Sequence, residues 1–171
     1  MGLIDWGEEL PLLPEGFYNV KFVGYRTAKY GGFGDSGKVR FEFEIVEFGP
    51  YFGTRLYRWY NANLTGRPKK NGSFKVGRNS DLYRELTRVL NRRLGRRDRL
   101  PVSLLRRLVI SAKVVTVKND GRQREIPPVA QYSKIAELLV AVEGGEHDPC
   151  PSPSPKPEPT PTRVPKRREK K

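Results

Sequence analysis

Apolar side chains occupy every second position over several stretches of the first third of the chain. The clearest stretch is residues 38–48, where valine, phenylalanine and isoleucine alternate with arginine and glutamate. A period of two predicts a β-strand, and similar patterns predict strands over residues 17–26 and 54–62. Gly24 indicates a bulge in the first strand. A tight turn at residues 49–53 joins the second strand to the third, which predicts a meander.

The period changes to that of a helix after a polar loop at residues 65–79. Ser80 is a typical N-cap, Asp81 lies in the first turn, and Gly95 is expected to end the helix. The apolar stripe of this helix consists of Leu82, Leu86, Val89 and Leu90. Residues 100–107 predict a further short helical turn, because a proline such as Pro101 is tolerated at a helix start.

The last third of the ordered sequence predicts two more strands and a closing helix. Residues 108–118 are strongly strand-like, and Asp120-Gly121 supplies a turn. Residues 123–132 are expected to return as a fifth strand, which two prolines exclude from a fully paired position. The segment "YSKIAELLVAV" at residues 132–142 is typical of a short C-terminal helix.

The order strand, strand, strand, helix, strand, strand is that of the OB-fold, a five-stranded, partly open barrel. We therefore expect a mainly β protein with some α-helix, while small barrels of other topology stay open. Residues 1–15 form an acidic N-terminal segment and residues 16–143 the OB-fold-like domain. Residues 144–171 contain eight of the fifteen prolines and predict a disordered tail that ends in a basic cluster. That tail either tethers nucleic acid through its basic end or serves as a solubilising spacer.

The charge of the 171-residue chain is strongly positive, at +14, and it is concentrated in the predicted domain. Residues 1–15 contribute −4 and residues 144–171 contribute +3, so the segment between them carries +15. Such a surface favours a polyanion, nucleic acid first and an acidic membrane or protein second. The alternative is an arginine-rich surface that serves solubility alone.

The sequence argues against several kinds of chemistry. A single cysteine, Cys150, and a single histidine, His147, exclude an intrachain disulfide and a Cys/His zinc set, so we expect no metal and no cofactor. The chain has no apolar stretch long enough to span a membrane and no typical signal peptide, which predicts a cytoplasmic location without membrane association. Carboxylates are scattered without the spacing of a metal-assisted active site, so we expect no enzymatic activity and no catalytic residues.

The glycine-rich run "GGFGDSGKV" at residues 31–39 matches both a dinucleotide fingerprint and an incomplete phosphate loop. Both motifs require a helix to follow, because the helix N-terminus binds the phosphate. Here a strand follows, and Val39 stands where a phosphate loop has a hydroxyl. The run is therefore interpreted as the hairpin loop between the first two strands, and its rings as candidates for base stacking.

An OB-fold binds oligonucleotides across its second and third strands, between the loops that join strands 1–2 and 4–5. Strand three has two faces, and the face with Trp59 is preferred over that with Leu56 as the binding face, because a buried Arg55 would be costly. The candidate contacts on the strands and the first loop are Tyr30, Phe33, Lys38, Arg40, Arg55, Tyr57 and Trp59. The other loops add Lys69, Lys70, Phe74, Lys75, Lys118, Arg122 and Arg124.

The predicted helix and the residues after it hold nine arginines between residues 84 and 107. Arg84, Arg88 and Arg92 recur every four residues, which predicts one exposed ridge. Like charges at this spacing destabilise a helix by a few tenths of a kcal/mol per pair, so a polyanionic partner is a reason to tolerate them. The ridge either extends the strand groove or makes a separate contact with duplex or RNA.

The segments "LPEGFYNVKFVGY", "FEFEIVEFGPYFGTRL" and "VISAKVVTVKNDGR" resemble, in order and spacing, the single-stranded-DNA-binding-like OB-fold proteins of phages and integrative mobile elements. The resemblance covers about residues 10–140 and is carried mainly by strand patterns and turns. It implies binding of single-stranded DNA in replication or recombination of a mobile element. The chain departs from many bacterial single-strand binders in its basic rather than acidic C-terminus.

The sequence thus predicts a non-enzymatic protein that binds single-stranded DNA by phosphate neutralisation and ring stacking, with little base readout. The alternatives are an RNA- or duplex-binding OB protein that acts through the arginine-rich helix, or a protein-binding adaptor. Replication or recombination proteins are the expected protein partners. The oligomeric state stays open, a homo-oligomer included.

Overall fold

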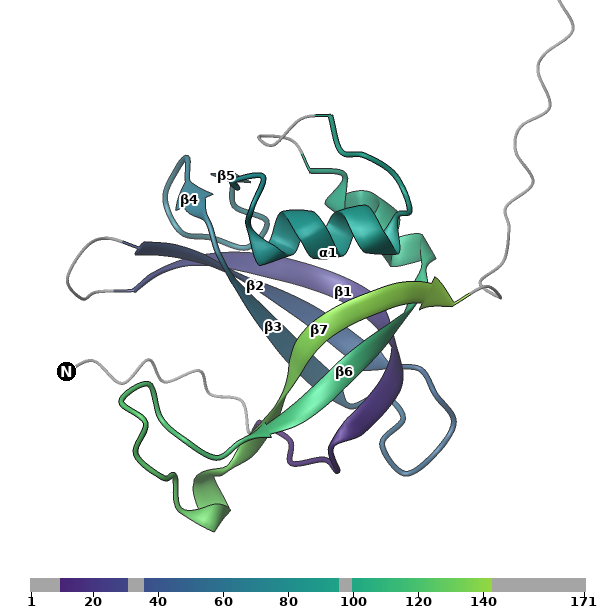
Figure 1. Ribbon diagram of the computed structural model, residues 1–171, viewed down its shortest axis with the longest axis vertical. Helices are drawn as coiled ribbons and strands as arrows, with labels where there is room; N and C mark the ends of the chain where they lie inside the picture. Colours follow the sequence, from purple (N-terminus) through teal and green to yellow (C-terminus); the bar gives the residue numbers. More distant parts are fainter. Residues whose placement is uncertain (1–9, 31–35, 96–99, 143–171) are drawn as a thin grey trace, which may run out of the picture.

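The protein is built on a five-stranded antiparallel sheet with a few short helices (Figure 1). The computed structural model describes residues 10–30, 36–95 and 100–142. The sheet order is β3-β2-β1-β6-β7, with strands β1 (Gly16–Tyr30), β2 (Ser36–Ile45), β3 (Arg55–Asn61), β6 (Val109–Val117) and β7 (Tyr132–Val142). The remaining elements are the short strands β4 (Asn63–Leu64) and β5 (Phe74–Lys75), the helix α1 (Asp81–Val89), and the 3-10 helices η1 (Val102–Arg107) and η2 (Pro128–Ala130).

The predicted meander is confirmed, because β1, β2 and β3 are consecutive antiparallel neighbours. The apolar positions of β2 all face the core, and none of them is more than 1% exposed. A tight turn follows β2, in which Gly53 has a φ of +77°. Glycine adopts this left-handed conformation without the steric strain that a Cβ would bring.

The predicted bulge in the first strand is also confirmed. Phe22 pairs with Phe43 and Gly24 with Glu42, so Val23 is an extra residue on β1. An extra residue reverses the alternation of side chains on the strand that carries it. Tyr25 therefore pairs with Phe41 of the core, whereas Arg26 pairs with Arg40 on the outer face.

The predicted C-terminal helix at residues 132–142 is wrong, because this segment is the strand β7. The predicted fifth strand at 123–132 is wrong for the same reason: most of it belongs to the loop before β7, with η2 inside it. The pairing of β7 with β6 contains two register shifts that place extra residues on β7. Between Ile135 and Leu138, both fully buried, one such shift changes the spacing of core positions from two to three. That spacing imitates one turn of a helix.

The helix α1 begins as predicted, with the Ser80 side chain accepting a hydrogen bond from the backbone N–H of Tyr83 at 3.2 Å. Leu82, Leu86 and Val89 are buried in the core. The helix ends at Val89, earlier than the predicted stop at Gly95. Asn91 has a φ of +46°, and a left-handed residue of this kind is a common way to end a helix.

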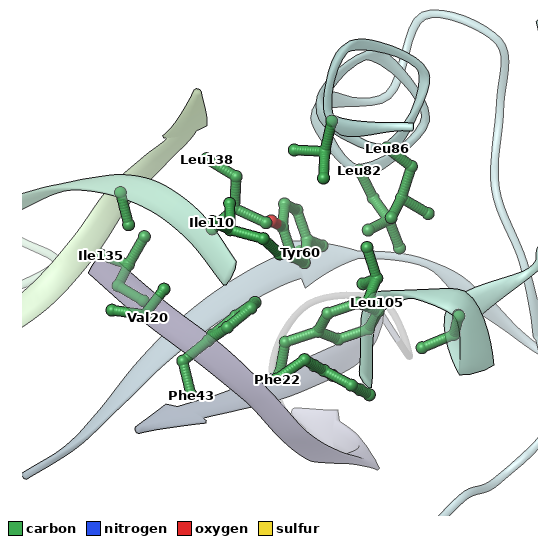
Figure 2. Close-up of a cluster of buried hydrophobic side chains, with 14 of the residues drawn as sticks. Val20, Phe22, Phe43, Tyr60, Leu82, Leu86, Leu105, Ile110, Ile135 and Leu138 are labelled. Atoms are coloured by element: carbon green, nitrogen blue, oxygen red, sulfur yellow. The ribbon is translucent and has the colours of Figure 1, made fainter. Parts of the chain in front are cut away.

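One hydrophobic core joins the inner face of the sheet to α1 and η1. In Figure 2, Leu82 and Leu86 project from the helix toward the ring of Tyr60, and Leu105 of η1 lies beside them. Residues 11–13, which precede β1, are part of the same structure. Leu13 is buried, its backbone N–H donates to the Ser133 hydroxyl at 2.8 Å, and the Ser133 N–H donates to the Pro11 carbonyl at 2.8 Å.

The hydrogen-bonded ladders end at β3 and β7, so the sheet is not closed into a barrel. The two edge strands nevertheless contact each other. Glu85 of α1 links them from the core side. Its carboxylate accepts hydrogen bonds from the Arg58 guanidinium at 2.7 Å, from the Tyr60 hydroxyl at 2.6 Å, and from the backbone N–H of Leu138 at 3.2 Å.

Candidate nucleic-acid interface

The face of β3 that the sequence analysis preferred for binding, the face with Trp59, lies on the outer side of the sheet. Leu56 and Tyr60 lie in the core cluster, and Arg58 on the same face pairs with Glu85. Tyr57 and Trp59 therefore lie on the opposite face, where Trp59 pairs in register with Arg40. This outcome resolves the alternative that the sequence left open about the two faces of this strand.

An arginine is stacked on both rings of this outer face. The guanidinium carbon of Arg40 lies 4.4 Å from the centre of the Tyr57 ring and 5.8 Å from that of Trp59. Arg40 is 8% exposed and Tyr57 is 6% exposed, whereas Trp59 is partly exposed. Tyr57 thus packs against Arg40 and is buried. Trp59 is the more exposed of the two rings, so it has more surface available to stack on a base.

A groove of about 630 Å³ runs between β3 and β7, where the ladder is not closed. Its walls combine the predicted outer face of β2 and β3 with the loop that joins β6 to β7. The residues that give the groove its chemical character are Lys38, Tyr57, Trp59, Tyr132 and Lys134. Aromatic and cationic side chains are therefore combined in one concave surface.

The loop between β6 and β7 is organised by Asp120. Its carboxylate accepts hydrogen bonds from the backbone N–H groups of Arg122 at 2.8 Å and Arg124 at 2.9 Å, and the Arg124 side chain pairs with it at 2.8 Å. These hydrogen bonds, with that of the Arg124 backbone first, lower the pKa of the Asp120 carboxyl. Lys118, Arg122 and Arg124 are all exposed, as the sequence predicted for this loop.

A second hollow, here called the cationic cleft, lies on the outer face beside the β1 bulge. It has a volume of about 330 Å³ and is lined by cations from five parts of the chain: Arg26, Arg40, Arg55, Lys70 and Arg106. Glu42 also lines the cleft and pairs with Arg55 at 2.7 Å. Five cations against one paired carboxylate make the cleft a strongly positive site.

Sequence reasoning missed Arg26 and Arg106 as members of this site. Strict alternation from Phe22 would turn Arg26 toward the core, and the bulge turns it outward. The predicted bulge at Gly24 was the signal from which the position of Arg26 could have been found. Arg106 has no comparable signal, because η1 comes near β1 only through tertiary packing.

The loop between β3 and α1 contributes unevenly to the surface. Lys70 lines the cationic cleft, while Lys69 and Lys75 are exposed. Phe74 is 8% exposed and belongs to the core, where its ring meets Tyr25 at a centroid distance of 5.5 Å. We therefore remove Phe74 from the candidate contacts: it anchors this loop to the core.

The arginine ridge predicted for the helix is shorter than expected: Arg84 and Arg88 are exposed on α1, but each has an acidic partner. Arg84 is paired with Asp81, and Arg88 is paired with Glu137 of β7. The second pair raises the pKa of Arg88 and lowers that of Glu137 through the hydrogen bond between them. Arg92 lies beyond the end of α1, so it does not continue the row.

The first hairpin loop is only partly within the described structure. Tyr30 is the last residue of β1 and pairs with Ser36. Phe33 lies outside the described residues, as does the predicted tail. Lys38 is the third residue of β2 and lines the groove.

Searches of the described ranges, 10–30, 36–95 and 100–142, give two negative results. They contain no cluster of three or more His, Cys, Asp or Glu side chains that could hold a metal ion. None of the helices in the same ranges is long and apolar enough to cross a membrane.

Arg40 lines the cationic cleft, and its guanidinium lies over two rings that line the groove, so the two hollows adjoin on the outer face of the sheet. Comparisons of the chain with models of known protein families, with curated proteins and with solved structures find no match.

Proposed function

We propose that the protein is a non-enzymatic single-stranded DNA-binding protein that uses the outer face of β1, β2 and β3. The observation that carries this proposal is the position of Arg40. It is stacked on Tyr57 and Trp59 of the groove and also lines the cationic cleft. Rings that could stack on bases and cations that could neutralise phosphates therefore lie side by side, and proteins that bind unpaired strands with little regard to sequence combine these two kinds of group.

We further propose that the sheet is of the OB type. The strand order β3-β2-β1-β6-β7, the helix between β3 and β6, and the contact between β3 and β7 support this assignment. An OB-fold binds oligonucleotides across its second and third strands. The groove beside β3 and its flanking loop correspond to that location. A role in replication or recombination of a mobile element is a proposal that rests on the resemblance described above.

The test is a titration of fluorescently labelled oligo-dT with the full-length protein, followed by anisotropy over a range of salt concentrations. We expect tight binding whose log affinity falls linearly with log salt, and weaker binding to duplex DNA of matched length. Competition with an RNA of the same length establishes the preference between the two polymers. Equal or stronger binding to duplex would contradict the proposal, as would no affinity for any nucleic acid at low salt.

A variant that lacks the Trp59 ring tests the stacking part of the proposal. Trp59→Ala is expected to weaken oligo-dT binding by about 1–3 kcal/mol, the usual contribution of one stacked base. Phe52→Ala is the control, because Phe52 is 60% exposed in the turn between β2 and β3 and lines neither the groove nor the cationic cleft. If both variants keep full affinity while the wild type binds, the groove is not the stacking site.

A further inference from the structure

A row of side chains crosses four neighbouring backbone segments and leads from the cationic cleft to Trp59 of the groove. Lys70 bridges to Arg26, Arg26 pairs with Arg40, and Arg40 pairs with Trp59. Directly paired residues of antiparallel strands project to the same side, and neighbouring strands lie about 4.8 Å apart. Three cations therefore stand side by side and lead to the tryptophan.

Such a row is unfavourable in the absence of a ligand. Like charges directly opposite each other on neighbouring strands destabilise a sheet. Within the described residues no ion pair reaches Arg26, Lys70 or Arg106. The described residues therefore do not neutralise these three cations through an ion pair.

The backbone that carries Lys70 is held in a fixed position. The Thr27 N–H donates to the Lys69 carbonyl at 3.1 Å, the Lys69 N–H donates to the Thr27 hydroxyl at 3.0 Å, and the Asn71 N–H donates to the Tyr25 carbonyl at 3.1 Å. Gly72 packs so closely against Thr27 that a Cβ would collide with its side chain. The loop thus behaves as an added edge of β1.

Arg106 approaches the cleft from a separate element that is also anchored. Val102 and Leu105 of η1 are buried in the core, which leaves Arg106 exposed at the cleft. Positions held by buried neighbours are typical of binding sites that are formed before the ligand arrives.

We propose that the cationic cleft is a phosphate subsite that binds internal phosphodiester groups of the strand whose bases lie at Trp59. This inference rests on the proposed function and specifies the path that the DNA backbone follows across the protein. The strand leaves the groove over Arg40 and places successive phosphates against Arg26, Lys70 and Arg106. Arginine guanidinium groups and the lysine ammonium group form hydrogen bonds and ion pairs with phosphate oxygens. The one carboxylate among the described lining residues, Glu42, is already paired with Arg55.

The first test replaces the three exposed cations together, in the variant R26Q/K70Q/R106Q. For single strands, each phosphate contact contributes about 0.7 to the slope of log affinity against log salt. We therefore expect the slope for oligo-dT to become shallower by about 2 and the affinity to fall about a hundredfold at 0.1 M salt, with the two lines converging near 1 M. The control R78Q/R93Q/K113Q removes three exposed cations that line neither the groove nor the cleft.

The second test predicts a gain of affinity, which damage to the fold does not produce. Glu42→Gln releases Arg55 from its ion pair and removes the one carboxylate among the described lining residues. By the same salt relation, one added phosphate contact tightens oligo-dT binding about fivefold at 0.1 M salt. Unchanged or weaker binding by this variant contradicts the subsite.

Two further comparisons identify the source of the phosphate. Oligo-dT with and without a 5′-phosphate should lose affinity equally in R26Q/K70Q/R106Q, because internal phosphates are the ligand. A loss confined to the phosphorylated oligonucleotide overturns the proposal in favour of an end-binding site. If the wild type binds oligo-dT and both triple variants behave alike, the subsite fails while the proposed function stands; if the wild type does not bind, the proposed function itself fails.

Discussion

The buried carboxylate of Glu85 offers the sharpest prediction about stability. Glu85 is 4% exposed, and the replacement Glu85→Ala removes an acceptor from three donors at once: Arg58, Tyr60 and the backbone N–H of Leu138. The Nε of Arg58 already has no hydrogen-bond partner, so the salt bridge to Glu85 is the main compensation for burying that charge.

The expected magnitude follows from these contacts. Breaking a buried ion pair from one side destabilises a protein by about 3–5 kcal/mol, because the other charge stays buried. The Arg58 side chain is 18% exposed, which places Glu85→Ala at the lower end of this range. A domain of this size is stable by about 5–15 kcal/mol, so Glu85→Ala removes a large part of the total. Glu85→Gln keeps one carbonyl acceptor and is expected to cost about 1–3 kcal/mol. The double variant Arg58→Met with Glu85→Leu removes both charges and should be less destabilised than Glu85→Ala.

The assay is urea unfolding monitored by circular dichroism, with free energies extrapolated to water. Glu137→Ala is the control, because it also removes a link between α1 and β7, but its pair with Arg88 is exposed. An exposed pair contributes about 0–1 kcal/mol. If Glu85→Ala were no more destabilising than Glu137→Ala, the argument that a buried carboxylate holds β3 and β7 together would be refuted. If Glu85→Ala does not fold, the comparison of Glu85→Gln with Glu137→Ala gives the same decision.

Three further predictions concern the fold. Burial, with the neighbouring Glu85 carboxylate as the next cause, raises the pKa of Tyr60 well above its usual value. As the pH rises, the unfolded chain therefore loses this proton before the folded one does, and the free energy of unfolding should fall above a pH of about 10 by up to about 1.4 kcal/mol per pH unit. Urea unfolding at about pH 9 and about pH 11 measures this fall, which should be smaller in Tyr60→Phe. Gly72→Ala should destabilise by about 1–3 kcal/mol through its collision with Thr27, and an unchanged urea midpoint would show that the loop is not pinned as described. Leu13→Ala should cost about 2–5 kcal/mol if the residues before β1 belong to the core, whereas Leu12→Ala, at an exposed position, should leave the midpoint almost unchanged.

The meander and the start of the helix could be predicted because local pattern and tertiary environment agree there. In β2 the inner positions are apolar and the outer ones polar throughout, so the period of two is unbroken. Ser80 caps α1 through a contact three residues away, which the sequence displays directly. In β7 the local sequence pattern and the tertiary environment disagree. Its extra residues shift the core positions out of alternation, and only the pairing with β6 shows that the segment is a strand.

The candidate site could be predicted only where its residues follow the local alternation of a strand. The outer faces of β2 and β3 follow from alternation, so Arg40 and Trp59 were found from the sequence. Arg26 was missed because its orientation depends on the bulge, and Phe74 was misplaced because its segment had no readable period. Arg106 reaches the cleft through the packing of η1, a contact between distant parts of the chain that no local pattern encodes.

The unclosed seam between β3 and β7 connects stability to the proposed function. On the core side, Glu85 spans the seam through Arg58 and the backbone of Leu138. On the outer side the same seam is the groove, and Arg58 is among the residues that line it. A fully paired barrel would replace this hollow with a continuous ladder and leave less room for bases. The carboxylate therefore fixes the separation of two strands that are not held by a ladder, and this separation sets the width of the groove beside Trp59.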